Sequence, residues 1–219
     1  MIDTILFDLD GTLLNTLLDL SNSTNFALKK FGFSQRSVEE VRAFVGNGLH
    51  RLIEQAVPAG TASETVDAVL SSMKSHYQEH CADETTLYFG ISELIDSLLS
   101  AGLRLAIVSN KAAPMTEFLR EKFFDGRINV AIGESPLQRR KPAPDMLLAA
   151  AERLGSSLER AVYVGDSDVD VLTASNAKIP CLSVGWGFRS AQDLADAGVR
   201  KVYQSPQELQ KALLLLASD

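Results

Sequence analysis

The sequence contains little cysteine, an excess of acidic over basic residues, and no long apolar run. Its 219 residues include two cysteines, and 21 Lys and Arg stand against 28 Asp and Glu. The formal net charge of −7 argues against nonspecific nucleic-acid binding, because that binding needs clustered cations to displace counterions from the phosphates. No apolar run approaches the roughly 18 residues of a membrane span. We therefore expect neither a nucleic-acid partner nor a membrane partner.

The two cysteines, Cys81 and Cys181, are far apart and lack the spacing of a metal site. We expect two unpaired thiols in a reducing compartment, although the sequence alone leaves a disulfide open. The chain begins directly with a strand-like run instead of a basic region followed by an apolar signal segment. We therefore expect a cytoplasmic globular protein. Nothing in the sequence indicates its oligomeric state.

Short β-rich runs alternate with longer stretches of helical periodicity, which is typical of a parallel α/β sheet. Their apolarity is continuous, so we expect strands that are covered on both faces by crossover helices. These features predict a Rossmann-like parallel sheet with helices on both faces. The runs are Ile5–Phe7, Leu103–Val108, Val130–Ile132, Ala161–Val164 and Cys181–Val184, with a short edge strand near Val199–Tyr203.

Residues 15–83 interrupt this alternation, since they contain amphipathic helical patterns and no convincing strand. Capping boxes are predicted at Ser37 with Glu40 and at Thr61 with Glu64. The segment is far longer than an ordinary βα loop. We therefore expect an all-α domain over residues 15–83, inserted into an α/β core formed by residues 1–14 and 84–219.

The last helix has a clear predicted start. Ser205 is the expected N-cap, Pro206 the first helical residue, and Glu208 the residue that closes a capping box. We expect this helix to continue to about Ala217.

Chemically useful side chains follow several of the predicted strands. The carboxyl ends of parallel strands lie along one edge of a sheet, where ligands bind, so these side chains are expected to converge. Taken singly, each has a common structural explanation, such as a helix cap or a solvated cluster. The residues are Asp8, Asp10, Gly11 and Thr12, then Ser109 and Asn110, then Lys141, then Asp166 and Asp170.

In this order, the residues resemble the four motifs of haloacid dehalogenase superfamily phosphatases whose helical cap is inserted after the first motif. The motifs read Asp8-Leu9-Asp10-Gly11-Thr12, Ser109-Asn110, Lys141-Pro142, and Gly165-Asp166-Ser167 with Asp170. The resemblance extends over essentially the whole chain. It implies a Mg²⁺-dependent phosphatase that acts on a small phosphorylated metabolite.

The resemblance also implies a role for each motif. Asp8 would attack phosphorus and form an aspartyl-phosphate, and Asp10 would act as general acid and then general base. Mg²⁺ would be bound by Asp8, the backbone carbonyl of Asp10, and Asp166, with Asp170 behind them. Asp168 is interpreted as a solvent-facing turn residue.

The remaining residues of the core motifs would bind the phosphoryl group. Ser109 and neighbouring backbone N–H groups would donate to its oxygens, and Lys141 would neutralise its charge. The other core residues expected to bind substrate are Gly11, Thr12 and Asn110.

The inserted domain would determine the choice of substrate. Gly46, Asn47 and Gly48 resemble a substrate-binding cap loop, and Arg51 or Arg42 could bind a substrate carboxylate. A helix-turn-helix corner with solvated arginines is an equally good interpretation. In the same domain, His76 and His80 have a spacing that could bind a metal, but a solvent-facing or core-edge position is the favoured interpretation. In the core, Trp186 could pack at the core edge or line the substrate entrance.

Several segments resemble phosphoglycolate phosphatases in particular, among them Asp19-Leu20 and Ser109-Asn110-Lys111. The chain departs from that pattern at Asn15, Phe89 and Lys178, where aspartate, proline and glycine are usual. A pyrophosphatase, or a phosphosugar or nucleotide phosphatase, is therefore an alternative. A noncatalytic phosphate-binding module is the alternative from a different class, but such a protein would be expected to have lost catalytic residues.

Overall fold

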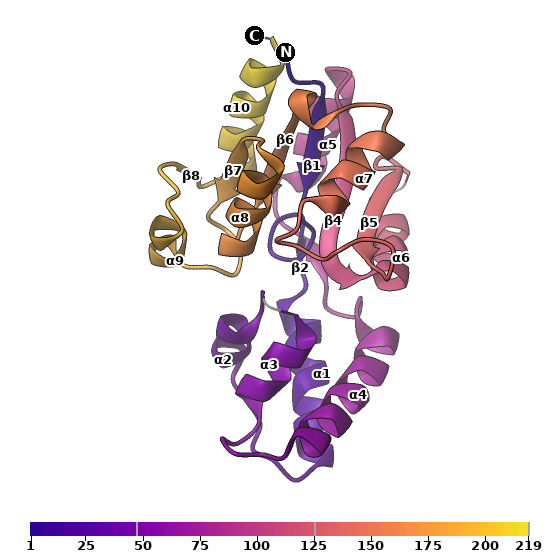
Figure 1. Ribbon diagram of the computed structural model, residues 1–219, viewed down its shortest axis with the longest axis vertical. Coiled ribbons are helices and arrows are strands. Elements are labelled where there is room, and N and C mark those ends of the chain that lie inside the picture. Colours follow the sequence, from indigo (N-terminus) through magenta and orange to yellow (C-terminus); the bar gives the residue numbers. More distant parts are fainter. Residues whose placement is uncertain (47, 125, 219) are drawn as a thin grey trace. The chain divides into compact units, whose positions relative to one another are not determined.

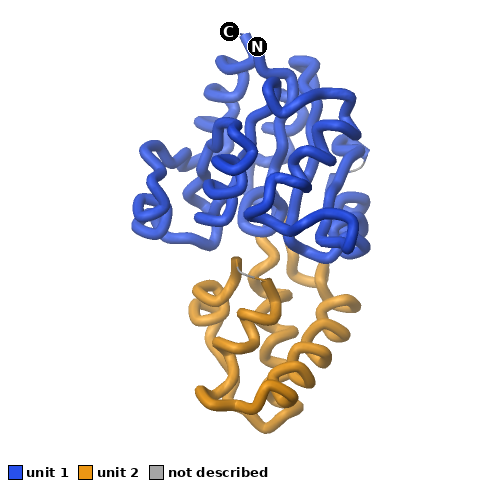
Figure 2. Tube along the Cα trace, in the orientation of Figure 1, with its two compact units in different colours: residues 1–14, 87–219 blue, residues 15–86 orange. Residues whose placement is uncertain are grey.

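The computed structural model describes residues 1–46, 48–124 and 126–218. The chain divides into two compact units (Figure 2). Unit 1 comprises Met1–Leu14 and Leu87–Asp219, and unit 2 comprises Asn15–Thr86. Unit 2 is thus an insertion in the sequence of unit 1.

Unit 1 is built on a six-stranded sheet with the order β5-β4-β1-β6-β7-β8 (Figure 1). Every neighbouring pair is parallel, which confirms the predicted Rossmann-like α/β fold. The strands are β1 (Thr4–Phe7), β4 (Arg104–Ala112), β5 (Val130–Glu134), β6 (Ala161–Gly165), β7 (Cys181–Val184) and β8 (Val202–Tyr203).

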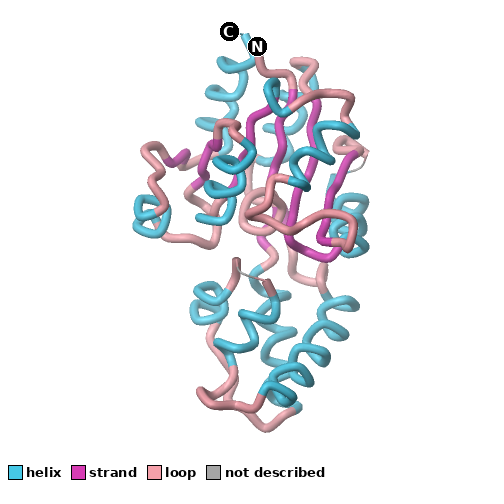
Figure 3. The backbone as a smooth tube through the Cα atoms, in the orientation of Figure 1, coloured by secondary structure: helices cyan, strands magenta, loops and turns pink. Residues whose placement is uncertain are grey.

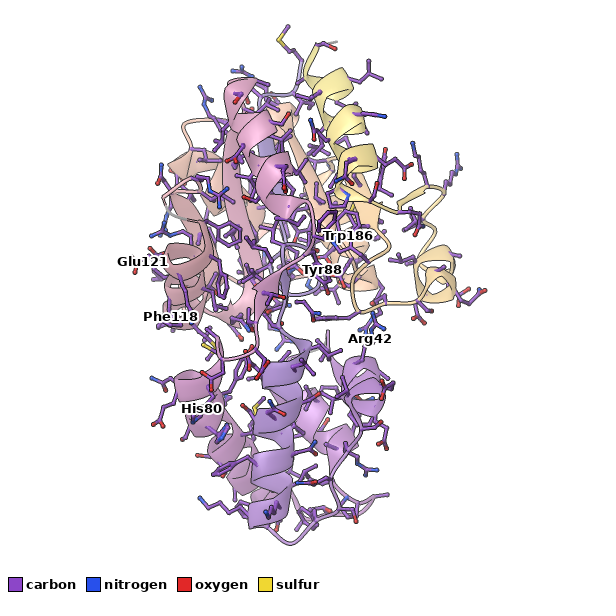
Figure 4. All side chains as sticks on the ribbon, turned by 180° about the vertical axis from the view of Figure 1, so that it is seen from behind. Arg42, His80, Tyr88, Phe118, Glu121 and Trp186 are labelled. Atoms are coloured by element: carbon purple, nitrogen blue, oxygen red, sulfur yellow. The ribbon has the colours of Figure 1, made fainter. Side chains whose placement is uncertain are left out.

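Helices cover both faces of this sheet. α7 and α8 lie on the face that is in front in Figure 1, and α5 and α10 lie on the face that is in front in Figure 4. Figure 3 shows the same alternation of strand and helix along the chain. The helices are α5 (Ile91–Ser100), α6 (Ala113–Phe124), α7 (Asp145–Arg153), α8 (Asp168–Ala177), α9 (Ala191–Asp196) and α10 (Pro206–Ser218), with a 3₁₀ turn at Leu158–Arg160.

Strand β1 lies in the centre of the core. Leu6 belongs to a buried cluster with Tyr163 of β6 and Met146 of α7, and its neighbours Ile5 and Phe7 are also completely buried. Successive side chains of a strand point to opposite faces, so a strand covered on both sides must be apolar throughout. This is why Ile5-Leu6-Phe7 shows no alternation of apolar and polar residues.

Unit 2 consists of four helices: α1 (Leu17–Lys30), α2 (Val38–Phe44), α3 (Leu49–Ala56) and α4 (Ser63–His80). Asp19 of α1 is buried, and its carboxylate accepts hydrogen bonds from the N–H groups of Glu84 and Thr85 and from the Thr85 hydroxyl. This carboxylate therefore joins the first helix of the unit to its last residues. The short strands β2 (Leu14–Asn15) and β3 (Thr86–Leu87) pair where the chain passes between the units.

The predicted helix starts were partly right. Ser37 and Glu40 form the expected capping box of α2. The box at Thr61 was wrong: α4 begins at Ser63, and the Thr61 hydroxyl instead donates to the Pro58 carbonyl at 2.7 Å.

For α10, Ser205 accepts from the Glu208 N–H as predicted. The second bond of the predicted capping box differs, because the Glu208 carboxylate accepts from the Gln204 N–H and not from the Ser205 N–H. Both α10 and the predicted helix begin at Pro206.

The remaining sequence features have simple structural outcomes. In the part of the chain that the structure describes, Cys81 and Cys181 are not joined in a disulfide, as predicted. No helix in the described ranges is both long and apolar enough to cross a membrane.

Candidate active site

The site lies where the carboxyl ends of β1, β4 and β6 meet. β1 pairs with β4 on one side and β6 on the other, and later strands extend the sheet outward in both directions. The middle of such a sheet is its topological switch point, where the loops on either side diverge and leave a crevice. Asp8 is the first residue after β1, and its N–H donates to the Val164 carbonyl of β6 at 2.8 Å. The sheet itself therefore fixes the position of Asp8.

Lys141 is the buried cation of the site. Its Nζ lies 2.8 Å from Asp8 Oδ1, 2.8 Å from Asp170 Oδ1 and 2.9 Å from the Tyr163 hydroxyl. The two carboxylates raise the pKa of Lys141 more than burial lowers it. The lysine is therefore charged at any physiological pH.

The backbone of Lys141 is held by the side chain of Asn110. The Lys141 N–H donates to Asn110 Oδ1 at 2.8 Å, and Asn110 Nδ2 donates to the Lys141 carbonyl at 3.1 Å. Both ends of this amide are thus bound to the lysine backbone. Asn110, which was expected to bind substrate, aligns Lys141 in this structure.

Asp166 follows β6 and is also buried. Its Oδ1 accepts from the Thr12 hydroxyl at 3.2 Å, and its Oδ2 accepts from the Phe188 N–H at 2.7 Å. Gly11 and Gly187 lie so close to this carboxylate that an added β-carbon on either would collide with it. The loops after β1 and β7 therefore fix its orientation.

Asp170, on the first turn of α8, has partners for both oxygens. Oδ1 accepts from Lys141 and from the Tyr163 hydroxyl, and Oδ2 accepts from the Ser167 N–H and hydroxyl. This carboxylate supports Lys141 from behind. Asp168 is half exposed and pairs with Arg189 at 3.0 Å.

Asp8, Asp166 and Asp170 have carboxylate oxygens that all lie within 4.8 Å of one another. Within the described residues they are the only group of three or more His, Cys, Asp or Glu side chains with this geometry. His76 and His80 are not part of such a group, and their rings stack on each other with centroids 4.3 Å apart.

The electrostatics of this cluster favour a bound cation. Burial and the repulsion from Asp170 raise the pKa of Asp166 to about 7, and burial is also the main reason why the pKa of Asp8 lies well above its usual value. When all three carboxyls are ionised, one lysine leaves two negative charges, and unneutralised buried charge is costly. Oxygen donors of this kind suit a hard divalent cation.

Asp10 lies at the more open side of the site. Its Oδ1 is 3.0 Å from the Nζ of Lys111, whose side chain is only 5% exposed. Gly11 then takes a φ of +89°, a left-handed conformation that favours glycine and turns the chain back toward Leu14. Ser109 is buried, and its hydroxyl accepts from the Lys111 N–H at 3.2 Å.

The predicted cap-loop residues lie in unit 2. Gly46 and Gly48 have φ angles of +122° and +85°, and Asn47 lies outside the described residues. Arg51 is 60% exposed and pairs with Glu54 at 3.0 Å. His50 lies 3.5 Å from carboxylate oxygens of Glu54 and of Asp67.

Sequence reasoning did not assign roles to Lys111, Tyr163 or Phe188. Lys111 was visible only as the residue after Ser109-Asn110. Tyr163 was counted as part of an apolar strand, although its hydroxyl was a signal that it needs a buried partner. Trp186, labelled in Figure 4, donates from Nε1 to the Thr12 carbonyl at 3.0 Å, so it packs on the first motif.

The site and fold together define a hydrolase built on a Rossmann-like sheet, and the comparisons agree. Residues 5–184 match the family described as haloacid dehalogenase-like hydrolase. The chain belongs to this family.

Among its relatives are enzymes named phosphoglycolate phosphatase. The protein of Nitrosococcus oceani is 33% identical over 216 residues, which cover 95% of each chain, and that of Colwellia psychrerythraea is 32% identical over 94% of this chain and 95% of its own. A crystal structure from Lactobacillus delbrueckii, provisionally named phosphoglycolate phosphatase, has a TM-score of 0.91 at 31% identity, covering 96% of this chain and 98% of its own. The chain is thus similar to phosphoglycolate phosphatases over nearly its full length.

Proposed function

We propose that this protein is a Mg²⁺-dependent phosphatase that hydrolyses a small phosphorylated metabolite, as phosphoglycolate phosphatases do, through an aspartyl-phosphate. The observation that carries this proposal is the buried cluster in which Lys141 joins Asp8 to Asp170 beside Asp166. A pair of strand-end carboxylates alone would be a common feature. A pair supported by a buried lysine and a further carboxylate combines a nucleophile with a cation that can neutralise an anionic substrate.

Asp8 is the proposed nucleophile. Its Oδ1 is held at 2.8 Å from Lys141, so the other oxygen is the one aligned for attack. Lys141 opposes the rise in the pKa of Asp8 and favours its reactive carboxylate form. A carboxylate oxygen would form a bond to phosphorus while the bond to the ester oxygen breaks.

Lys141 and Ser109 would stabilise the negative charge of the phosphoryl group. Lys141 supplies a permanent positive charge next to the attacking oxygen, and the buried Ser109 hydroxyl is available as a donor when a ligand is present. The N–H groups of Gly11 and Thr12, which were expected to bind substrate, donate to the Leu14 and Leu9 carbonyls, so they are not assigned to the phosphoryl group. When bound by Asp8, Asp166 and the Asp10 carbonyl, Mg²⁺ would neutralise charge on the transferring phosphoryl oxygens.

Asp10 is the proposed acid and base. In its protonated form it would give its proton to the departing ester oxygen, so the leaving group departs as an alcohol. As a carboxylate it would then accept a proton from the water that attacks phosphorus. The phosphorus bond to Asp8 breaks in that second step and releases phosphate.

Residues 15–86 are the proposed cap, with residues 46–51 as the loop that selects the leaving group. Two of its glycines, Gly46 and Gly48, have positive φ angles that favour glycine, so the loop conformation depends on residues without a β-carbon. The names of the similar proteins support phosphoglycolate as the first substrate to test. The two cysteines, Cys81 and Cys181, are not disulfide-bonded, which supports the proposal of a cytoplasmic location.

The test is hydrolysis of phosphoglycolate and of an aryl phosphate by purified protein, with Mg²⁺ and with a chelator. We expect phosphate release that requires Mg²⁺ and is lost in Asp8→Asn, while Asp168→Asn, altered at a half-exposed acid, retains it. Equal release by the native protein and Asp8→Asn would contradict the mechanism. Absence of any hydrolysis, together with saturable phosphate binding, would support the noncatalytic module. A pyrophosphatase or a phosphosugar or nucleotide phosphatase would instead show a clear preference for those substrates.

A further inference from the structure

We propose that Lys111 binds a carboxylate on the leaving group and so selects acidic phosphate monoesters. This inference rests on the proposed function, in which Asp10 contacts the ester oxygen. Lys111 Nζ lies 3.0 Å from Asp10 Oδ1, and both residues belong to unit 1. The cation is therefore on the leaving-group side of the reaction centre.

The backbone of Lys111 is held firmly. β4 continues to Ala112, whereas β1 ends at Phe7, which is paired with Ile107. Lys111 lies on this extension of β4, where its N–H donates to Ser109 Oγ and its carbonyl accepts from the Thr116 hydroxyl at 3.1 Å. The register of β4 against β5 shifts between Val108 and Ala112, so the regular alternation of a strand does not fix the direction of Lys111, which is instead given by its contact with Asp10.

The distances place a leaving-group carboxylate within reach of Lys111. A general acid must lie about 2.6–3.2 Å from the oxygen that it protonates, so the ammonium group is within about 6 Å of the ester oxygen. In phosphoglycolate a single methylene separates that oxygen from the carboxylate. An ammonium group has three N–H donors, so the bond to Asp10 is compatible with donation to a substrate.

The two buried lysines thus lie near different parts of the substrate, Lys141 near the phosphoryl group and Lys111 near the leaving group. Lys141 contacts Asp8 and Asp170, which places it on the phosphoryl side, and Lys111 contacts Asp10. Arg51, the cation expected from the sequence to bind a carboxylate, is 60% exposed and pairs with Glu54. A buried ammonium is screened less by water and salt, so it discriminates better between charged and neutral ligands.

A purely supporting role for Lys111, acting through Asp10, makes a different prediction. Loss of that support would slow the hydrolysis of every substrate to a similar extent, because each one needs the same acid. Loss of a carboxylate contact would slow only the acidic substrates. Two substrates that differ only in this group can therefore separate the roles.

The experiment compares phosphoglycolate with 2-hydroxyethyl phosphate, which carries a neutral CH₂OH in place of the carboxylate. The native protein, Lys111→Met, Lys111→Arg and the exposed control Lys122→Met are assayed with Mg²⁺. Relative to the native protein, we expect Lys111→Met to lower the ratio of kcat/KM for phosphoglycolate to that for 2-hydroxyethyl phosphate by at least about 10-fold, mainly through KM. Lys111→Arg should keep the preference in part, and Lys122→Met should keep it fully.

An equal loss on both substrates would overturn the role of Lys111 and leave the proposed function intact. Failure of the native protein to hydrolyse either substrate would overturn the proposed function, and the role of Lys111 with it. If Lys111→Met does not fold, product inhibition of the native protein decides. Glycolate should then inhibit at a concentration at least about 10-fold lower than ethylene glycol, and equal inhibition would refute the carboxylate contact.

Discussion

Tyr163 shows how the site depends on single buried hydrogen bonds. Its hydroxyl lies 2.9 Å from both Lys141 Nζ and Asp170 Oδ1, and it is completely buried. Tyr163→Phe keeps the ring but removes one partner from each charged group. We expect the free energy of unfolding to fall by about 1–3 kcal/mol and kcat to fall by roughly 10-fold with little change in KM, because Lys141 loses alignment. Urea denaturation and steady-state kinetics measure the two effects.

Tyr203→Phe is the matched control, since Tyr203 lies on the edge strand β8 near Lys201. It should leave kcat unchanged. If Tyr163→Phe matches the native protein in both stability and kcat, the hydroxyl does not position Lys141.

At the scale of single residues, the sequence predicted the motif side chains but not the contacts between them. The sequence predicted which side chains carry the motifs, because strand ends and polar residue types are local signals. The pairs Lys111–Asp10, Trp186–Thr12 and Phe188–Asp166 join residues that are 22 to 174 positions apart. Such contacts arise from the close approach of loops after packing, so no local pattern announces them.

The loop after β7 helps to fix the orientation of Asp166. A β-carbon on Gly187 would collide with the Asp166 side chain. Gly187→Ala should therefore displace a proposed metal ligand, and we expect the Mg²⁺ concentration for half-maximal activity to rise by about 10-fold or more. In Gly185→Ala, the added carbon meets the Gln204 amide at 2.7 Å, which is the end of a flexible side chain. That control should change the Mg²⁺ requirement little, and equal effects of the two variants would contradict the steric argument.

The end of α8 contains a residue in an unfavourable conformation. Lys178 is the C-cap, with φ 58° and ψ 38°. Among the residues that the structure describes, it is the only one other than glycine with a positive φ. This explains why glycine is usual at this position. Lys178→Gly should raise the free energy of unfolding by up to about 1 kcal/mol, since relief of the β-carbon clash exceeds the added entropy of the unfolded chain. Lys178→Ala retains the β-carbon and should change stability by less than about 0.5 kcal/mol in the same denaturation experiment.

Helix starts show why elements are predictable only in part. The Ser37 box was correct because its two residues need only each other. At Thr61, the hydroxyl donates to a competing local acceptor, the Pro58 carbonyl, and so does not cap the helix. α4 begins at Ser63 instead. Side-chain bonds to nearby backbone compete with caps, so the residue pattern alone does not decide the outcome.

At the scale of the whole molecule, the sheet brings together residues from most of the length of unit 1. Strand order could be anticipated only as a parallel sheet, because the sequence pattern does not say on which side of β1 each later strand is added. The observed order places β4 and β6 on opposite sides of β1, and this brings Asp8, Ser109 and Asp166 to one crevice. Because negative charge is concentrated there, we expect the stability of the whole protein to depend on pH and on metal.

Without metal, the raised pKa of Asp166, about 7 against 3.8 for the unfolded carboxyl, makes the folded state bind more protons than the unfolded state between these values. Stability should therefore be highest at the acid end of this window and fall as the pH rises toward 7. Mg²⁺ should restore stability most strongly at and above pH 7, where it no longer competes with protons. Thermal unfolding from pH 5 to pH 8, with chelator and with Mg²⁺, measures this. A metal-free protein that becomes steadily more stable across the window would contradict the charge argument.

Asp166→Asn separates stability from metal binding. The substitution removes one of three clustered carboxylates, so the metal-free variant should be more stable than the metal-free native protein at pH 7.5. It should also lose the stabilisation by Mg²⁺, which for the native protein is about 2.7 kcal/mol at a concentration 100 times Kd. Asp168→Asn alters the neighbouring half-exposed acid and should keep the full response to Mg²⁺. A metal-free Asp166→Asn protein that is less stable than the native one, yet still responds to Mg²⁺, would show that Asp166 serves packing and not a cation. The expected pattern would mean that the protein gives up stability at this crevice to keep a site for the metal.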